Sequence, residues 1–338
     1  MMNIKDLLFA LSGLDSIGNI TEVQDKVLEI LSPYCKPEKM DDNNILGFMK
    51  GEKDYTIMLD AHIDQVGLVV TNVDDNGFLT VASVGGIDIR ALPSRTVTVH
   101  GKEKISAVFC ATPPHLASGE VEYSDISAIK LDTALGKKTK EIVAIGDYVT
   151  FNTKPFGLSD DIVCGRSFDD RAGVVALLEV ARRLTGKTLP VNIVFAFSTA
   201  EELGLRGAKT ASFKADPQEA IAIDVTFGDG PDVSSDESCK LGGGAMIGLS
   251  PALSRDVGKK LISLAKENNI PYDLEVMGER TGTNADAIGI SRAGVKTTTV
   301  SIPLRNMHSA VETLNINDIT AVCDLLEKYI LSGGVLND

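Results

Sequence analysis

The chain has 338 residues and carries 33 Lys and Arg against 47 Asp and Glu, which gives a formal net charge of −14. This excess of acid argues against nucleic acid as a partner, because such proteins need a basic surface. No stretch of about 18 consecutive apolar residues occurs, so we expect no membrane span. The five cysteines are scattered and never spaced as CxxC. They fit a reducing compartment, so we expect a cytoplasmic protein.

The first half of the chain begins with helical periodicity and then changes to short β-type runs. Apolar residues recur at helical spacing over residues 4–11 and 23–31, and residues 55–60 form an apolar run typical of a buried strand. From about residue 67 to 165, short runs rich in Val, Ile, Thr and Phe alternate with Gly, Pro, Asn and Asp. This texture predicts a small β-rich unit without a long helix.

After residue 165, predicted helices and strands alternate again. Helical spacing marks residues 174–184 and 321–330, and strand-like apolar runs cover residues 191–197, 220–223 and 297–302. The alternation favours the α/β class, with a mostly parallel sheet flanked by helices. We therefore predict an α/β domain built from residues 1–67 and 165–338. Residues 68–164 would be an inserted β-rich domain.

Residue types that bind metals lie where the predicted strands end. The candidates are His62 and Asp64 after strand 55–60, Glu201 and Glu202 after strand 191–197, Asp224 after strand 220–223, His308 after strand 297–302, and Asp169 and Asp170 before helix 174–184. The carboxyl ends of parallel strands share one rim of an open sheet, and ligands bind there. The sequence therefore predicts a single site at this rim.

The chemistry of these residues fits metal-assisted hydrolysis. Imidazole nitrogens and carboxylate oxygens are normal ligands of catalytic zinc. Two His and three carboxylates exceed the needs of one ion and suit two, bridged by a carboxylate and a water. A further carboxylate must move the proton. The adjacent Glu201 and Glu202 can supply both a ligand and a base, because neighbouring side chains in an extended segment point in different directions.

Five segments of the chain carry a resemblance to a known family. They are AHIDQVG (61–67), GRSFDDRAG (165–173), AEELGLRGA (200–208), AIDVTFGD (222–229) and SIPLRNMHSAVE (301–312). Together, and in this order, they resemble the dinuclear metallo-aminopeptidases of metallopeptidase family 42, the tetrahedral or deblocking aminopeptidases. The resemblance runs from about residue 7 to 330, which is nearly the whole chain.

The resemblance implies a role for each candidate residue. His62 and Asp224 would hold one metal, Glu202 and His308 the other, and Asp169 would bridge them, through a strained peptide to Asp170. Asp64 would orient His62, and Glu201 would be the general base and then the acid. The two ions would be zinc, with cobalt or manganese as alternatives, and the substrates would be short peptides. The resemblance also implies a zinc-exopeptidase-like catalytic domain in residues 1–67 and 165–338 and an inserted PDZ-like domain in residues 68–164 that serves dimerisation or assembly. It further implies a homo-oligomer in which dimers assemble to a dodecamer.

The chain departs from the family pattern at two positions near the motifs. Gln65 stands where the family usually has Glu, and Asn284 stands where Asp is usual. Neither change removes a proposed ligand or Glu201. His115 lies in the loop 111–125, where it would be either solvated or close to the cavity of a neighbouring subunit.

Two other functions remain open at this point. A glycoside hydrolase needs two carboxylates flanking a sugar and typically no metal. The chain is only 5% aromatic and has no Trp, so it offers few platforms on which sugars stack. A non-catalytic peptide-binding or assembly protein is the second alternative, and the complete ligand set argues against it. The preferred N-terminal residue of the substrate stays undetermined from sequence.

Overall fold

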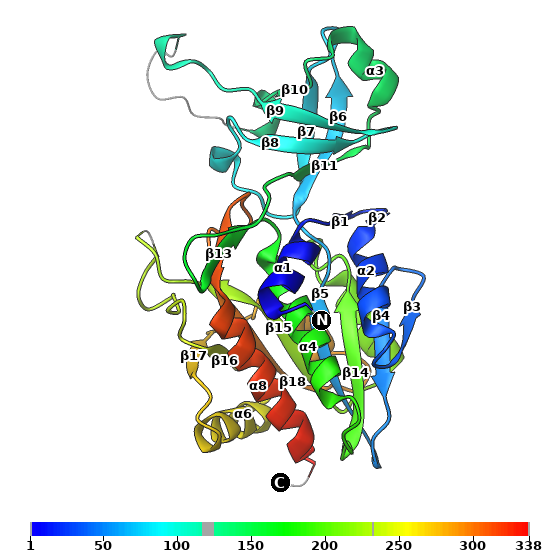
Figure 1. The fold of residues 1–338 in the computed structure, drawn as a ribbon, viewed down its shortest axis with the longest axis vertical. Helices are drawn as coiled ribbons and strands as arrows, with labels where there is room; N and C mark the ends of the chain where they lie inside the picture. Colours follow the sequence, from blue (N-terminus) through cyan, green and yellow to red (C-terminus); the bar gives the residue numbers. More distant parts are fainter. Residues whose placement is uncertain (1, 117–124, 232, 337–338) are drawn as a thin grey trace.

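The computed structural model describes residues 2–116, 125–231 and 233–336. It consists of a large α/β unit, which holds both ends of the described chain, and a smaller β-barrel at one end of it (Figure 1). Within these residues, no helix is long and apolar enough to cross a membrane.

An 11-stranded sheet forms the centre of the α/β unit. Its strands are β12 (Phe156–Gly157), β13 (Ile162–Gly165), β19 (Glu312–Asn315), β18 (Lys296–Arg305), β15 (Glu219–Phe227), β5 (Lys53–His62), β14 (Val191–Ser198), β4 (Ile45–Met49) and β3 (Lys36–Lys39) in spatial order, with β16 (Ala245–Leu249) on β18 and β17 (Tyr272–Val276) on β16. The four central strands β18, β15, β5 and β14 are parallel, as expected. Antiparallel pairs flank them on both sides, so the sheet is mixed.

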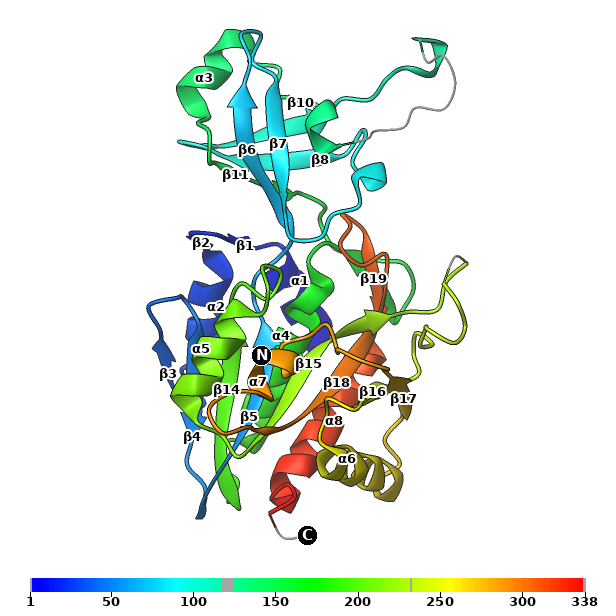
Figure 2. The ribbon, with the colours of Figure 1, turned by 180° about the vertical axis from the view of Figure 1, so that it is seen from behind.

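Helices cover both faces of the sheet. The helices α1 (Ile4–Ser12), α2 (Glu22–Leu31), α4 (Phe168–Leu184), α6 (Arg255–Glu267) and α8 (Ile316–Ser332) lie in front in Figure 1, and α5 (Arg206–Ala215) and α7 (Ala285–Ile288) lie behind, as Figure 2 shows. Successive side chains of a strand point to opposite faces of the sheet, so each central strand contributes to a core on both faces. In β15, Ile221 and Ile223 pack in the larger core with α4 and α8, whereas Ala220 and Ala222 pack with α5 and α7.

The small unit is a closed barrel of six strands, in the order β10-β7-β6-β11-β8-β9. The strands are β6 (Gly67–Val73), β7 (Leu79–Val84), β8 (Thr96–His100), β9 (Lys104–Phe109), β10 (Leu131–Asp132) and β11 (Tyr148–Phe151), and the short helix α3 (Thr139–Ile142) lies between β10 and β11. The barrel has its own core, which includes Leu79, Val97, Val99 and Leu131. It is the inserted β-domain that the resemblance implies, at the expected position in the chain.

The last strand of the barrel ends before the predicted range of the insertion, 68–164, does. This strand, β11, ends at Phe151, and β13 pairs with β19 of the large sheet, although we placed residues 162–164 in the insertion. Short strands that owe their pairing to a distant partner carry no local pattern that would assign them to one unit. We propose that the inserted domain ends near residue 151.

Candidate metal centre

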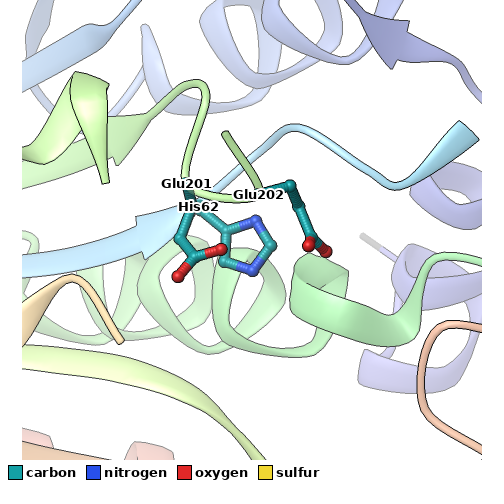
Figure 3. Close-up of side chains that lie close together, drawn as sticks. All are labelled: His62, Glu201 and Glu202. Carbon is teal, nitrogen blue, oxygen red and sulfur yellow. The ribbon is translucent and has the colours of Figure 1, made fainter. Parts of the chain in front are cut away.

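The predicted site residues lie together at the carboxyl rim of the parallel strands. His62 is the last residue of β5 and lies beside Ser198, the last residue of the neighbouring parallel strand β14. Glu201 and Glu202 follow β14 in a turn, so that their side chains lie next to His62 (Figure 3). All five proposed ligands and Glu201 line one cavity of about 620 Å³.

Asp224 reaches this rim from within a strand rather than from its end. We predicted that the strand ends before Asp224, but β15 continues to Phe227 and stays paired with β18 over its whole length. Val225, Thr226 and Phe227 are good strand formers, which explains the extension. Asp224 still faces the cavity, because its side chain lies on the face opposite the core residue Ile223.

Asp169 lies between the two histidines. Its Oδ1 is 3.0 Å from Nε2 of His62, and its Oδ2 is 3.2 Å from Nε2 of His308. Glu202 Oε1 lies 3.3 Å from the same nitrogen of His308, and Asp224 Oδ1 lies 3.9 Å from Nε2 of His62. A carboxylate with one oxygen toward each imidazole is arranged as a bridging ligand of two ions would be.

The side chains form three overlapping groups in which all donor atoms lie within 4.8 Å of one another. They are His62 with Glu201 and Glu202, His62 with Asp170 and Asp224, and Asp169 with Glu202 and His308. One buried oxygen of Asp170, Oδ2, has no hydrogen-bond partner, which is a costly state unless a cation is bound nearby. The donor set and this unpartnered oxygen fit divalent metal ions.

Asp170 takes a larger part than the resemblance implied, which gave it only a strained peptide bond to Asp169. Its Oδ1 accepts a hydrogen bond of 2.8 Å from the backbone N–H of Gly173 inside α4. The peptide bond between Asp169 and Asp170 is cis. The fully buried Asp170 also lies in the donor group of His62 and Asp224, and only the assembled fold reveals this.

Asp64 holds the turn that carries the two glutamates. Its Oδ1 accepts a hydrogen bond of 3.1 Å from the N–H of Glu201, and its Oδ2 accepts one of 3.3 Å from the N–H of Glu202. Oδ1 is also 3.5 Å from Nδ1 of His62. The sequence suggested only the contact with His62. Asp64 therefore links the imidazole of one strand end to the backbone of the next.

Glu312 holds the backbone of two residues of the centre in place. It lies in the last quoted segment, but its sequence context gave it no role. Its Oε2 accepts hydrogen bonds from the N–H groups of Phe168 (2.6 Å) and Asp169 (3.2 Å), and its Oε1 accepts one from the N–H of His308 (3.0 Å). Glu312 is only 1% exposed. Burial, and next the charge of Asp169, raise its pKa to about 8.

Burial and the many neighbouring carboxylates shift the pKa values of side chains in the centre. Burial raises the pKa of Glu201 to about 7, and the neighbouring charge of Glu202 adds to this, while His62 opposes it. Burial alone would lower the pKa of His308, but hydrogen bonds to Asp169 and Glu202 outweigh burial and raise it to about 11. Bound cations would neutralise this concentration of negative charge.

Comparison with known proteins identifies the family. The profile described as M42 glutamyl aminopeptidase matches residues 43–325. The chain belongs to this family. It is an aminopeptidase, a hydrolase that acts on peptide bonds.

Relatives of this M42 chain match it over almost its whole length. The lysyl aminopeptidase of Pyrococcus furiosus is 31% identical, over 94% of this chain and 92% of that protein. The solved aminopeptidase of the archaeon Desulfurococcus kamchatkensis is 29% identical with a TM-score of 0.91, and 99% of each chain is covered. The TET1 peptidase of Pyrococcus horikoshii, which is described as assembling into a tetrahedron or a large octahedral shell, is 30% identical with a TM-score of 0.87, over 97% of this chain and 99% of that one.

The two departures of this M42 chain from the family pattern lie outside the cavity and have local partners. Gln65 Oε1 accepts hydrogen bonds of 3.2 Å from Nη2 of the buried Arg171 and from the backbone N–H of Ser16. Asn284 donates through Nδ2 to Asp60 Oδ2 (2.7 Å) and to Ser198 Oγ (2.8 Å). His115 is exposed on a short 3-10 turn of residues 114–116.

Proposed function

We propose that the chain is a dinuclear metal-dependent aminopeptidase that removes N-terminal residues from short peptides. The observation that carries this proposal is the position of Asp169, whose two oxygens face His62 and His308 within one cavity. Family membership supplies the reaction class, and the donor groups supply the reason for a metal.

The proposed ligand assignment is the one that the resemblance implies, and the donor groups around Asp224 and around His308 support it. His62 and Asp224 would hold one ion, Glu202 and His308 the other, and Asp169 would contact both. When bound, two divalent ions supply Lewis-acid chemistry: they lower the pKa of water and polarise the substrate carbonyl. We favour zinc, and cobalt or manganese would accept the same nitrogen and oxygen donors.

Glu201 would move the proton during hydrolysis. It lines the cavity next to His62, and burial raises its pKa above the ordinary value of a glutamate, as suits a general base. In this role its carboxylate accepts a proton from the attacking water and passes it to the amino nitrogen of the leaving peptide. Asp64 keeps Glu201 in place through the hydrogen bond to its backbone N–H.

The alternatives considered from sequence are weaker. A glycoside hydrolase would need aromatic platforms, and Phe227 is the one aromatic side chain among the described residues that line the cavity. A non-catalytic binding protein would not need the closely spaced donors around Asp169. Both alternatives predict that chelators leave the function unchanged.

We further propose that the chain assembles through its barrel into dimers and then a dodecamer. A solved TET1 relative is described as a dodecamer. All five cysteines are free, which suits the cytoplasm as the proposed location. Light scattering of the purified protein tests the assembly: a mass near twelve chains is expected, and a monomer at all concentrations contradicts it.

A panel of aminoacyl p-nitroanilides tests the proposed activity. The metal-depleted protein should be inactive and should regain hydrolysis with zinc, cobalt or manganese. An N-acetylated substrate serves as the matched control, since an aminopeptidase needs the free amine. Activity that survives chelation, or equal cleavage of the acetylated substrate, would contradict the proposal. The names of the relatives do not settle the preferred residue, because the family is called glutamyl and one relative lysyl.

A further inference from the structure

Two carboxylates that line the cavity of the metal centre, Glu275 and Asp286, belong to no ligand group. Asp286 accepts its hydrogen bonds from residues 281–282 of its own loop. Glu275 lies on β17, beyond β16 at the side of the sheet (Figure 2), and lines the same cavity as the metal donors. Its Oε1 accepts a hydrogen bond from the hydroxyl of Thr226, and its Oε2 accepts one of 2.7 Å from the hydroxyl of Ser301. Both oxygens are thus fixed in position.

The two hydroxyl partners place Glu275 close to the reacting centre. Ser301 lies directly opposite Asp224 in the parallel pair β15–β18, and Thr226 follows Asp224 by two residues, so that all three share one face. Neighbouring strands are about 4.8 Å apart. The carboxylate of Glu275 is therefore one strand spacing and one hydrogen bond away from Asp224, within reach of a long side chain on the substrate.

Glu275 has no cationic partner within the described part of the chain. Its two donors are neutral hydroxyls, and no ion pair among the described residues joins it to Arg280 or Lys209, the arginine and the lysine that line the cavity. Arg280 and Lys209 are exposed, whereas Glu275 is partly buried. A charge pair gains strength where water is excluded, and exposed charges are screened. Glu275 should therefore act more strongly than these two exposed cations on a charged side chain of the substrate.

We propose that Glu275 makes the enzyme selective for peptides that begin with lysine or arginine, by pairing with the cation at the end of that side chain. This rests on the proposed aminopeptidase function, which fixes the N-terminal amine at the metal centre. The hydroxyl groups of Thr226 and Ser301 hold the carboxylate toward the substrate. In this arrangement the N-terminal side chain lies across β15 and β18 and ends at β17.

Kinetics on matched substrates test the selectivity. The wild-type enzyme should have a higher kcat/KM for the Lys and Arg p-nitroanilides than for those of Leu and Glu. Glu275→Gln should lower the ratio of kcat/KM for Lys over Leu by about tenfold or more, mainly through KM, since it removes the charge and preserves the size. Glu279→Gln is the control, because Glu279 is an exposed acid nearby that does not line the cavity. An unchanged ratio in Glu275→Gln, or a preference for Glu in the wild type, would overturn the proposal.

The affinity of the wild-type protein for charged and uncharged amides is a second test, and it does not depend on how the variant folds. Calorimetry should show that lysine amide binds at least about tenfold more tightly than norleucine amide, which has a similar length but no side-chain charge. Equal affinities would contradict selection by Glu275. If lysine amide is favoured but no aminoacyl substrate is cleaved with any metal, the aminopeptidase proposal fails while the role of Glu275 stands. Cleavage that favours Leu over Lys would support the aminopeptidase proposal and overturn the role of Glu275.

Discussion

The side-chain amide of Asn284 donates a hydrogen bond of 2.7 Å to the buried carboxylate of Asp60. The two residues are 224 positions apart in sequence, and both are almost completely buried. Burial already raises the pKa of Asp60 to about 6. Asn284 therefore stabilises the ionised form of Asp60. An acid at position 284 would instead oppose this ionisation.

The substitution Asn284→Asp restores the residue usual in the family and should destabilise this chain. Two buried carboxylates in contact cannot both ionise, so one keeps a proton with a raised pKa. A raised pKa in the folded state favours folding at low pH, and that contribution is lost as pH rises through the folded pKa. We expect a loss of about 2–3 kcal/mol at pH 8 and a smaller loss at pH 5.

Urea unfolding of Asn284→Asp and the wild type at both pH values measures this effect. Asn284→Ala is the control, because it removes the donor without adding a charge. A difference from the wild type that is equal at pH 5 and pH 8 would show that Asp60 and position 284 do not share a proton.

Replacement of Glu312 should weaken metal binding without removing a ligand. Glu312→Ala frees the backbone N–H groups of Asp169 and His308, so that both side chains lose their fixed orientation. Loss of such supporting groups typically lowers metal affinity about 10–100-fold. Calorimetric titration with Zn²⁺ measures the affinity, and the exposed acid Glu267 provides a control as Glu267→Ala. An unchanged affinity in Glu312→Ala would refute the supporting role.

Substitutions of Asp169 and Glu202 should have different effects on metal content. Asp169 faces both histidines, whereas Glu202 is close to His308. Asp169→Asn should therefore weaken both ions, and Glu202→Gln should weaken one and leave about one ion per chain. Metal analysis after dialysis measures the content. Identical metal content in the two variants would speak against Asp169 as the shared ligand.

Glu201→Gln should separate proton transfer from metal binding. The variant keeps the size of the side chain but cannot accept a proton, so we expect kcat to fall by about 10²–10⁴-fold. Metal content should stay at the wild-type value, since Glu201 is not among the proposed ligands. Near-normal kcat in this variant would exclude Glu201 as the general base, and lost metal would assign it a ligand role instead.

The sequence predicts the donors of the centre better than it predicts their support. His62, Glu202 and His308 lie at or just beyond strand ends, and parallel strands bring such ends to one rim. This rule requires only that the strands be recognised. It does not fix the strand lengths, which is why Asp224 was placed after a strand that in fact continues to Phe227.

Residues whose hydrogen-bond partners are distant in the sequence have no local sequence pattern that would reveal their role. Glu312 reaches Asp169 across 143 positions, and Glu275 contacts Thr226 across 49. Each is a single acid in an ordinary segment, and its role depends on how distant elements dock. The antiparallel outer strands were missed for a similar reason, because β12 and β13 are too short to show alternation.

The dependence of activity on bound metal tests the dinuclear centre most directly. Zn²⁺ is added stepwise to the metal-depleted protein, and hydrolysis of an aminoacyl p-nitroanilide is followed at each addition. We predict that the rate rises until two ions are bound per chain and then stays constant. Full activity in the depleted protein, or a plateau after a single ion, would contradict a centre in which Asp169 bridges two metals.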